Sequence, residues 1–552
     1  MTLVCVPITV ESVEQALEEA ALARTLGADL IELRVDDLFT GEQHEADEII
    51  RLLSRCPLPA ILTCRPAWEG GGYDGDETDR ISMFEFVCTS ERPPAYLDVE
   101  LAAYTASENI RQKVNLCVAH PKQTRSVKTR LILSSHDFDT RPADLTKRLL
   151  AMYAEPSCAV AKIAYRARSI RDNLELFEIT REAPKPTIAL GMGEFGLMSR
   201  VLAQKFGGFL TFASLRDTTA TAPGQPTISD LLGMYRFRSI GRETKLYGVI
   251  GWPVTQSLSP AIHNAGFEAV GHDGVYLPMP VVADADDPEA STAGLRVTIG
   301  SLADHASLEG ASVTIPHKEA LACLYAGEGD VYAGRDVVRS IGAANTLSWE
   351  WHEDDDVGRI RDSNELVFNT DATALRALLG EELGVMQGRT LCVVGAGGVA
   401  RAAVWAGLQA RADVVIVNRS PSRAEALADW FNGQGDQSWE RSVRVVGLDQ
   451  IATLNAAAYV NCTPVGMATG PDPDGLSIPV PDMLVAPATV FFDTVYNPIE
   501  TPMLRAARER GCRTIDGVQM FVRQAAEQFR LWTGKAAPAE LFDRICREKL
   551  GG

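Results

Sequence analysis

The chain has 552 residues, of which 46% are hydrophobic and 23% are charged, and its formal net charge is −20. This length exceeds what one hydrophobic core usually supports, so it predicts several domains. The negative charge repels polyanions and argues against nucleic-acid and acidic-membrane partners, although a few local cations could still bind small anions. The composition therefore indicates a protein that acts on small molecules.

The cysteines and the first residues indicate the compartment. Eleven cysteines are scattered singly, and no Cys-x-x-Cys pair occurs. This pattern argues against a disulfide framework and for a reducing compartment, and no spacing is typical of a metal site. The segment from Met1 to Thr9 indicates a strand and not a signal or transit peptide. With no apolar run of about 18 residues, we expect a cytoplasmic protein without a metal site or a membrane span.

The first 235 residues alternate short β-rich apolar runs with helical patterns. Eight strands alternating with helices predict a (β/α)8 barrel, a TIM barrel, and a doubly wound open sheet is the alternative. The runs lie near residues 3–9, 30–35, 60–65, 95–99, 130–135, 158–164, 186–191 and 209–213. Polar residues near the strand ends favour the barrel, because only a barrel brings that many strand ends around one small molecule. These residues are Glu32, Arg34, Arg65, His136 and Lys162.

Lys162 and His136 are the candidate catalytic residues of this half. Lys162 lies in the apolar run 159–164, where burial disfavours the charged ammonium and favours an amine suited to Schiff-base chemistry. A strand-end lysine that reaches solvent or pairs with a carboxylate is the structural alternative. His136 ends another strand and could move protons near neutral pH. Glu69 could orient its imidazole, and Arg65 could bind an anion.

As a set, several stretches resemble type I 3-dehydroquinate dehydratase over residues 1–235. They are 32–36, 63–71, 135–138, 162–164, 192–200 and 221–225. The resemblance implies that Lys162 forms a Schiff base with the ketone of 3-dehydroquinate, without a cofactor. It implies that His136 moves the protons, Glu69 tunes His136 and Arg200 holds the substrate carboxylate. The other substrate-binding residues that it implies are Glu32, Arg34, Arg65, Thr221 and Gln225.

A second α/β region begins near residue 247, after a short polar linker at 236–246. The charged segment 350–363 predicts a solvated loop or a hairpin. From Leu391 a strand enters a glycine-rich turn and then a helix, an arrangement whose helix N-terminus can bind a pyrophosphate. Arg419 follows the next strand, where an NAD site usually has an acidic residue, so NADP is favoured over NAD. A surface role for Arg419 would leave that choice open.

Lys318 follows a predicted strand, and Asp371 lies at the end of another predicted element. Such a pair could handle the proton that accompanies hydride transfer to a ketone, and a structural salt bridge is the alternative. Ser257 and Ser259 offer two hydroxyls suited to a carboxylate, although Ser-Pro turns are common.

The second half resembles shikimate dehydrogenase over residues 245–552, with further matching stretches at 341–346, 461–467, 493–498 and 516–524. The resemblance implies a two-domain α/β unit with a Rossmann-like NADP-binding domain, in which Lys318 and Asp371 are catalytic. The substrate-binding residues that it implies are Ser257, Ser259, Thr314, Asn345, Tyr496 and Gln524. The NADP-binding residues that it implies are Gly395, Ala396, Gly397, Gly398, Val399, Asn418, Arg419, Ser420, Thr463 and Gly517.

The chain departs from this family pattern at Ser312, where an asparagine is usual, and at Ala372 and Ala374, where glycines are common. We expect these changes to affect loop shape and turnover more than the chemistry. The predicted domains are a dehydratase barrel at 1–238, a substrate-binding domain at 245–375 plus 520–552, and an NADP-binding domain at 376–519.

The whole pattern predicts a bifunctional enzyme that dehydrates 3-dehydroquinate to 3-dehydroshikimate and reduces this to shikimate with NADPH. Its partners would be these small molecules, and the chain would be a monomer or a homodimer. One alternative is a catabolic quinate dehydrogenase fusion that uses NAD, which Arg419 disfavours. Another is a metabolite-sensing regulator that retains both folds, which the presence of all four catalytic candidates disfavours.

Overall fold

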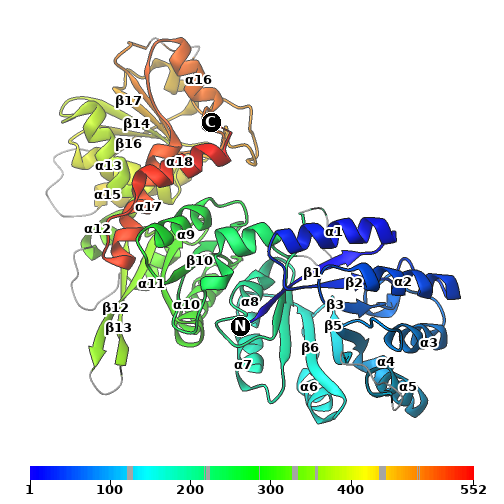
Figure 1. Cartoon of the computed structure of the whole chain (residues 1–552). Coiled ribbons are helices and arrows are strands. Elements are labelled where there is room, and N and C mark those ends of the chain that lie inside the picture. The colour runs from blue at the N-terminus through cyan, green and yellow to red at the C-terminus, as the bar shows by residue number, and fades with distance from the viewer. Residues whose placement is uncertain are drawn as a thin grey trace. The chain divides into compact units, whose positions relative to one another are not determined.

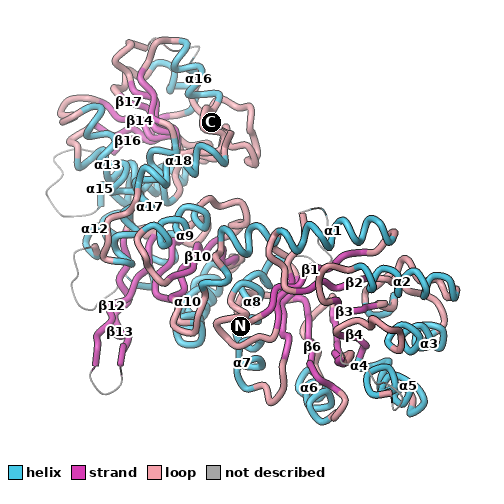
Figure 2. The backbone as a smooth tube through the Cα atoms, viewed as in Figure 1, coloured by secondary structure: helices cyan, strands magenta, loops and turns pink. Residues whose placement is uncertain are grey.

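The computed structural model describes residues 1–120, 128–216, 218, 224–284, 286–325, 334–354, 358–433, 443–480, 483 and 485–551 (Figures 1 and 2). Thr221, one of the predicted substrate-binding residues, lies outside these ranges. The chain divides into two compact units, Met1–Thr244 and Lys245–Gly552. Within the described residues, no helix is long and apolar enough to cross a bilayer.

The first unit is a barrel of eight parallel strands, as the sequence predicts. The strands are β1 (Leu3–Thr9), β2 (Leu30–Arg34), β3 (Ala60–Thr63), β4 (Tyr96–Glu100), β5 (Arg130–Asp137), β6 (Cys158–Arg166), β7 (Thr187–Met192) and β8 (Leu210–Phe212). They pair in the order β7-β6-β5-β4-β3-β2-β1-β8. A backbone hydrogen bond of 2.9 Å from Phe209 N–H to the Thr187 carbonyl crosses the remaining seam.

Helices follow the strands of this unit and surround the sheet (Figure 1). Their order along the chain is α1 (Val13–Thr25), α2 (Gln43–Arg55), α3 (Glu77–Cys88), α4 (Leu101–Ala106), α5 (Glu108–Ala119), α6 (Leu145–Ala154), α7 (Asp172–Glu182) and α8 (Leu197–Val201). In α1, Ser12 caps the N-terminus by accepting a hydrogen bond from Gln15 N–H, and Ala16, Ala20 and Ala23 are buried at helical spacing.

The interior of the barrel changes from apolar to polar along its axis. An apolar cluster takes at least one residue from each strand, including Cys5, Leu30, Ile61, Tyr96, Ile132, Val160, Ile188 and Leu210. Strand side chains alternate with a period of two, so the residues two positions further on also face the interior. On five strands these residues are polar and buried: Glu32, Thr63, Asp98, Ser134 and Lys162. The barrel therefore carries a polar layer directly above its apolar layer.

The second unit contains two sheets. The first has the order β10-β9-β11-β12-β13, and its strands are β9 (Lys245–Gly251), β10 (Gly274–Pro280), β11 (Leu308–Val313), β12 (Thr346–Asp354) and β13 (Gly358–Phe368). The charged segment 350–363 falls in the antiparallel β12–β13 hairpin, which agrees with the predicted loop or hairpin. The helices near this sheet are α9 (Ser259–Ala269), α10 (Pro288–Ala306), α11 (Lys318–Tyr325), α12 (Arg335–Ile341), α17 (Gly517–Thr533) and α18 (Ala539–Lys549).

The second sheet is parallel and has the order β16-β15-β14-β17-β18-β19. This is the strand order of a Rossmann fold, which confirms the predicted fold class, and nucleotides bind where the order reverses. Its strands are β14 (Thr390–Val394), β15 (Asp413–Val417), β16 (Val443–Val446), β17 (Ala458–Asn461), β18 (Val490–Asp493) and β19 (Arg513–Ile515). Its helices are α13 (Thr370–Leu383), α14 (Gly398–Gln409), α15 (Pro421–Gly433) and α16 (Pro502–Glu509).

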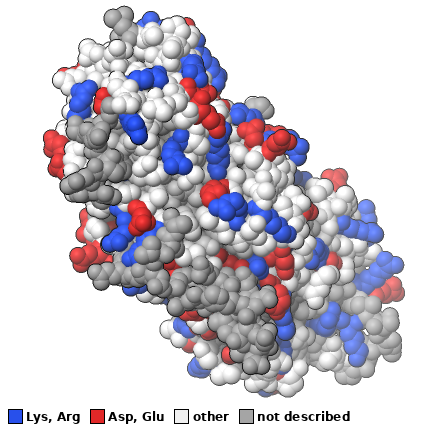
Figure 3. All heavy atoms as spheres, turned by 90° about the vertical axis from the view of Figure 1, so that its left-hand side faces the viewer, with Lys and Arg blue, Asp and Glu red and all other residues white. Residues whose placement is uncertain are grey.

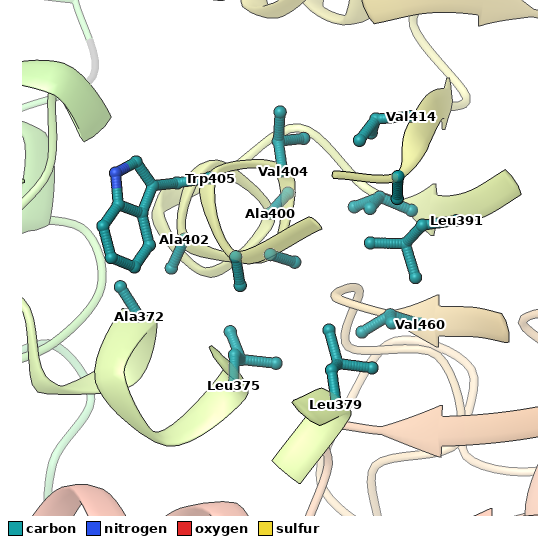
Figure 4. Packing of buried hydrophobic residues seen from close by; sticks show 14 of the residues in the cluster. Ala372, Leu375, Leu379, Leu391, Ala400, Ala402, Val404, Trp405, Val414 and Val460 are labelled. Atoms are coloured by element: carbon teal, nitrogen blue, oxygen red, sulfur yellow. The ribbon is translucent and has the colours of Figure 1, made fainter. Parts of the chain in front are cut away.

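Helices α13 and α14 build one core of this Rossmann sheet (Figure 4). Leu375 and Leu379 of α13 lie in the same buried cluster as Leu391 and Val460 of the sheet. Ala372 is fully buried in this cluster as well. Alanine is preferred over glycine inside a helix by about 1 kcal/mol, so its methyl group fits this helical position. The departure from glycine at Ala372 therefore lies in a packed helix and not in a loop.

Candidate active sites

A pocket opens at the carboxyl ends of the barrel strands and gathers most of the site residues predicted in the first half. Its lining residues are Glu32, Arg34, Arg65, Glu69, Gly70, His136, Phe138, Lys162, Ala164, Leu190, Met192, Arg200, Phe212 and Gln225. Two residues of the polar layer, Glu32 and Lys162, line it. Lys162, one of the residues that line the pocket, is only 4% exposed.

Lys162 is held in the pocket by two carboxylates. Its Nζ lies 2.8 Å from Asp98 Oδ2 and 3.3 Å from Glu32 Oε1. The ammonium also lies 4.7 Å from the ring centroid of Phe212. Burial and a carboxylate pair, which the sequence presents as alternatives, thus occur together. The pairing fixes the amine at the pocket floor.

Arg65 organises the carboxylates beneath the pocket. Its guanidinium donates to Asp98 Oδ1 at 2.8 Å, to Glu100 Oε1 at 2.5 Å and to Ser134 Oγ at 2.9 Å. Burial by itself would raise the pKa of Asp98, but the charges of Arg65 and Lys162 outweigh it and hold that pKa below its usual range. Through these hydrogen bonds, Arg65 fixes the positions of Asp98, Glu100 and Ser134 beneath the pocket.

Asp98 and Glu100 belong to the hydrogen-bonded group beneath the pocket, and the sequence analysis missed both. Both are fully buried in β4, one above the other. The signal was present, because Tyr96, Asp98 and Glu100 alternate and therefore share one face of the strand. A charged face usually points to solvent, and here it points into the barrel.

His136 and Glu69 form the dyad that the sequence predicts. Glu69 Oε1 accepts hydrogen bonds from the backbone N–H of His136 at 2.8 Å and from its ring Nδ1 at 2.9 Å. Burial raises the pKa of Glu69 to about 8 even though Arg65 is close. Burial, with the charges of Arg65 and Lys162, lowers the pKa of His136 well below its usual value. The imidazole is therefore neutral near pH 7, and Nε2 is its acceptor nitrogen when Nδ1 donates to Glu69.

Arg200 differs from the other cations of the pocket. It is 2% exposed, and its Nε has no hydrogen-bond partner among the described residues. Burial lowers the pKa of Arg200 to about 10. Arg34, by contrast, is paired with Asp36 through two hydrogen bonds of 2.8 Å. A buried unpartnered guanidinium requires an anion, so Arg200 is the cation best placed to hold a substrate carboxylate.

In the second unit, Lys318 Nζ lies 2.5 Å from Asp371 Oδ2. Lys318 is the first residue of α11, and Asp371 lies in the first turn of α13, which Asn369 caps by accepting from Ala372 N–H at 2.9 Å. A Cβ at Gly398 would lie 3.1 Å from the Lys318 side chain. The lysine therefore packs against the start of α14, beside the glycine-rich turn.

Hydrogen bonds connect some of the predicted substrate-binding residues to the helix turn that carries Asp371. Asn345 binds Thr370, the neighbour of Asp371, through Nδ2 at 3.0 Å, and Thr370 Oγ1 lies 3.4 Å from Gln524 Oε1. Ser259 N–H donates to Ser257 Oγ at 3.2 Å, which orders that loop. Among the described residues, no hydrogen bond joins Ser257, Thr314 or Tyr496 to Lys318.

The glycine-rich turn after β14 fits a nucleotide. Gly395 has a φ of +122° and its Cβ position lies 3.0 Å from the Cys462 carbonyl, so a larger residue is excluded. A Cβ at Gly397 would meet no atom within 4 Å, which leaves space above the N-terminus of α14. The free N–H groups of that helix end can bind a pyrophosphate.

The other predicted cofactor-binding residues lie on loops at the ends of this sheet and of its helices. Asn418 Nδ2 donates to the Ser420 carbonyl at 2.9 Å, and Thr463 Oγ1 donates to Asn461 Oδ1 at 2.7 Å. Gly517 begins α17. Arg419 follows β15, is exposed and makes no ion pair with any described residue, so its guanidinium is available for a 2′-phosphate. Together these residues fit NADP.

Basic and acidic side chains are interspersed on the face shown in Figure 3, and the described residues there form no large area of one sign.

Comparison with known proteins gives matches in both units. Family models match for type I 3-dehydroquinase at residues 4–242, for the shikimate dehydrogenase substrate binding domain at 249–347 and for the shikimate 5′-dehydrogenase C-terminal domain at 517–544. The chloroplastic bifunctional 3-dehydroquinate dehydratase/shikimate dehydrogenase of Arabidopsis thaliana is 35% identical over 99% of this chain and 84% of that protein. The chain belongs to this bifunctional family.

Two further proteins resemble the second unit. The NADP(+) shikimate dehydrogenase of Methanocella arvoryzae is 36% identical over 55% of this chain and 99% of its own length. A crystal structure of shikimate dehydrogenase in complex with NADP+ is 30% identical, with a TM-score of 0.47, and the match covers 56% of this chain and 97% of that one.

The lowered pKa of His136 leads to a prediction about how kcat/KM of the dehydratase reaction depends on pH. A base must be neutral to accept a proton, so kcat/KM should stay level as the pH falls through 6.5, the ordinary pKa of histidine, and should decline only below it. Glu69, with its pKa raised to about 8, should add an inflection near that pH. The Glu69→Gln variant keeps a hydrogen-bond acceptor and should lose the inflection. Initial rates of formation of the conjugated enone, measured by ultraviolet absorbance across pH, check both points. In the Glu69→Gln variant, which lacks the Glu69 titration, an acid limb at or above pH 6.5 would contradict the argument that burial lowers the pKa of His136.

The position of Arg419 leads to a prediction about the preference for NADP+ over NAD+. Arg419→Ala should raise the KM for NADP+ by roughly tenfold to a hundredfold, because a charge-assisted contact to the 2′-phosphate is lost. The KM for NAD+ should change less than about threefold. Steady-state oxidation of shikimate with each nucleotide measures the ratio, with Arg444→Ala as a control at another exposed arginine, on β16. Equal changes for both nucleotides would remove Arg419 from the phosphate site.

Proposed function

We propose that the first unit converts 3-dehydroquinate to 3-dehydroshikimate and that the second unit reduces this product to shikimate with NADPH. The observation that supports this most directly is the presence of two complete sites in one chain of the bifunctional family. In the first, a buried amine, a neutral imidazole and an unpartnered guanidinium face one pocket. In the second, a lysine–aspartate pair lies beside a nucleotide-binding turn.

The dehydration begins with Lys162. Its nitrogen, an ammonium before the reaction, bonds to the ketone carbon while two of its protons pass to the ketone oxygen, which leaves as water, and this gives an iminium with one positive charge. Asp98 and Glu32, already beside Nζ, stabilise that charge. Arg200 holds the substrate carboxylate, so the ring is fixed at two points.

His136 then moves the proton. Nε2 of the neutral imidazole removes the proton on the carbon next to the iminium, and the electron pair passes to the nitrogen to form an enamine. The enamine expels the hydroxyl, which His136 protonates so that it leaves as water. Hydrolysis of the conjugated iminium releases the product and restores Lys162. Glu69 keeps Nδ1 as the donor and so keeps Nε2 aimed at the substrate.

In the second unit, the glycine-rich turn and the N-terminus of α14 would hold NADPH, which when bound would provide a hydride for the ketone. Lys318 donates the proton that the new hydroxyl requires, and Asp371 holds the ammonium in place and balances its charge. Ser257, Ser259, Asn345 and Gln524 are proposed to bind the substrate. We assign Tyr496 and Thr314 to the same substrate site on the family resemblance alone.

A cytoplasmic location and a monomeric or homodimeric state complete the proposal. The Arabidopsis relative is described as chloroplastic, so the location proposed for this chain differs from the one printed for that relative. A catabolic role with NAD is disfavoured by the exposed Arg419 after β15. A regulator without activity is disfavoured by the intact geometry of both sites.

Trapping tests the Schiff base. Borohydride added with 3-dehydroquinate should reduce the iminium and leave a stable adduct on Lys162, found by peptide mapping. The His136→Ala variant should still form the adduct while its dehydration rate falls at least about a hundredfold, since general acid–base catalysis contributes that much. An adduct elsewhere, or none on an active enzyme, would contradict the mechanism.

A coupled assay tests the whole proposal. With 3-dehydroquinate and NADPH, the intact protein should consume NADPH, whereas Lys162→Ala should do so only when 3-dehydroshikimate is supplied. Lys318→Ala should lose at least about a hundredfold in kcat for reduction and keep its NADPH affinity. A mixture of the two variants should recover flux from 3-dehydroquinate. NADPH consumption from 3-dehydroquinate by Lys162→Ala alone would exclude the assignment, and equal loss of kcat and NADPH affinity in Lys318→Ala would make that residue structural.

A further inference from the structure

Three buried polar residues outside the predicted site form a hydrogen-bonded chain in the second unit. Tyr276 of β10, Ser312 of β11 and Gln528 of α17 are 0%, 7% and 1% exposed. The Tyr276 hydroxyl donates to Ser312 Oγ at 2.7 Å, and Ser312 Oγ donates to Gln528 Oε1 at 2.8 Å. The chain thus crosses from one strand to the next and then to a C-terminal helix.

One end of this chain reaches Asn345. Gln528 Nε2 donates to Thr346 Oγ1 at 3.0 Å and to the Asn345 carbonyl at 3.2 Å. Thr346 Oγ1 in turn donates to Asn345 Oδ1 at 2.9 Å. Asn345 Oδ1 also accepts from Thr370 N–H at 2.8 Å, next to the catalytic candidate Asp371.

The other end reaches the serine loop. The Ser259 side chain lies near enough to the Tyr276 phenol to lower its pKa, which offsets part of the rise that burial causes. The Ser259 backbone N–H, as described above, donates to Ser257 Oγ. The chain therefore joins the serine loop on one side of the second site to Asn345 and the Lys318–Asp371 group on the other.

The directions of these bonds determine how Asn345 presents its amide. Its Oδ1 is occupied by Thr346 Oγ1 and Thr370 N–H, and one Nδ2 hydrogen is donated to Thr370 Oγ1. The second Nδ2 hydrogen is the remaining donor, so this amide faces a ligand as a hydrogen-bond donor. Because buried polar groups lose about 1–3 kcal/mol when a partner is removed, the chain strongly favours one orientation of the amide.

We propose that Tyr276, Ser312 and Gln528 are positioning residues for the dehydrogenase reaction, which hold Asn345 and Ser259 in the orientations that bind the substrate hydroxyls and carboxylate. This inference rests on the proposed function of the second unit. Ser312 stands where asparagine is usual in shikimate dehydrogenases. Gln528 contacts both Ser312 and the Asn345 carbonyl, so its amide links the two residues.

The Ser312→Ala variant removes the middle link and leaves Tyr276 and Gln528 without their shared partner. We expect the KM for shikimate to rise about tenfold, kcat to fall less than about threefold, and the Kd for NADP+ to stay within about twofold. Ser348→Ala is the matched control, because Ser348 is also buried on an adjacent strand and makes no side-chain hydrogen bond with any described residue. Dehydratase activity of the same polypeptide reports the active enzyme concentration.

A double-mutant cycle with Tyr276→Phe distinguishes a chain from separate packing effects. If the residues act through one another, Tyr276→Phe with Ser312→Ala should raise KM no more than Ser312→Ala alone. Additive increases would overturn the proposal, as would an equal loss of NADP+ affinity or an equal effect of Ser348→Ala. A wild-type protein that does not oxidise shikimate would instead refute the proposed function of the second unit.

Discussion

Charge neutralisation inside the barrel is the constraint on which the first site depends. Asp98 and Glu100 are fully buried, and an isolated carboxylate at such a position would cost several kcal/mol. Arg65 bridges both carboxylates, and Lys162 provides a second cation to Asp98. Arg80 pairs with the remaining oxygen of Glu100 at 2.8 Å. Removing any one of these groups leaves an uncompensated buried charge, so the amine, its carboxylates and the arginines must be present together.

The same neutralised cluster suits the chemistry proposed for it. Ammonium and iminium each carry one positive charge at the same nitrogen, so the carboxylates around Lys162 need not rearrange as the covalent bond forms. A site arranged beforehand avoids reorganisation during the reaction, which is a major source of electrostatic catalysis. Arg200 lies outside this balance because it has no partner among the described residues. A substrate carboxylate bound to Arg200 would neutralise its charge. Binding at that end of the pocket would then hold the substrate ketone near Lys162 at the other end.

The sequence predicted the elements and the strand-end residues better than it predicted how residues of the interior pair. Glu32, His136 and Lys162 could be predicted because parallel strands in a barrel end at one mouth. Asp98 was missed because a single strand does not show whether its polar face meets water or the inside of a closed sheet. The contact between Ser312 and Gln528 joins positions 216 residues apart. Nothing in the local pattern shows that the C-terminal helix returns to β11, so such a chain becomes visible only in the folded unit.

The second unit uses one backbone feature for two purposes. Gly398 begins the helix whose N-terminal amides face the nucleotide site, and its missing side chain lets Lys318 pack 3.1 Å from its Cβ position. The positive end of that helix and the ammonium would repel each other, and Asp371 at 2.5 Å offsets this cost. A larger residue at position 398 would therefore displace both the pyrophosphate and the lysine. One turn of backbone therefore lies against Lys318 and also forms the start of α14, so under the proposed function the nucleotide site and the proton donor would be held at a fixed separation by the fold.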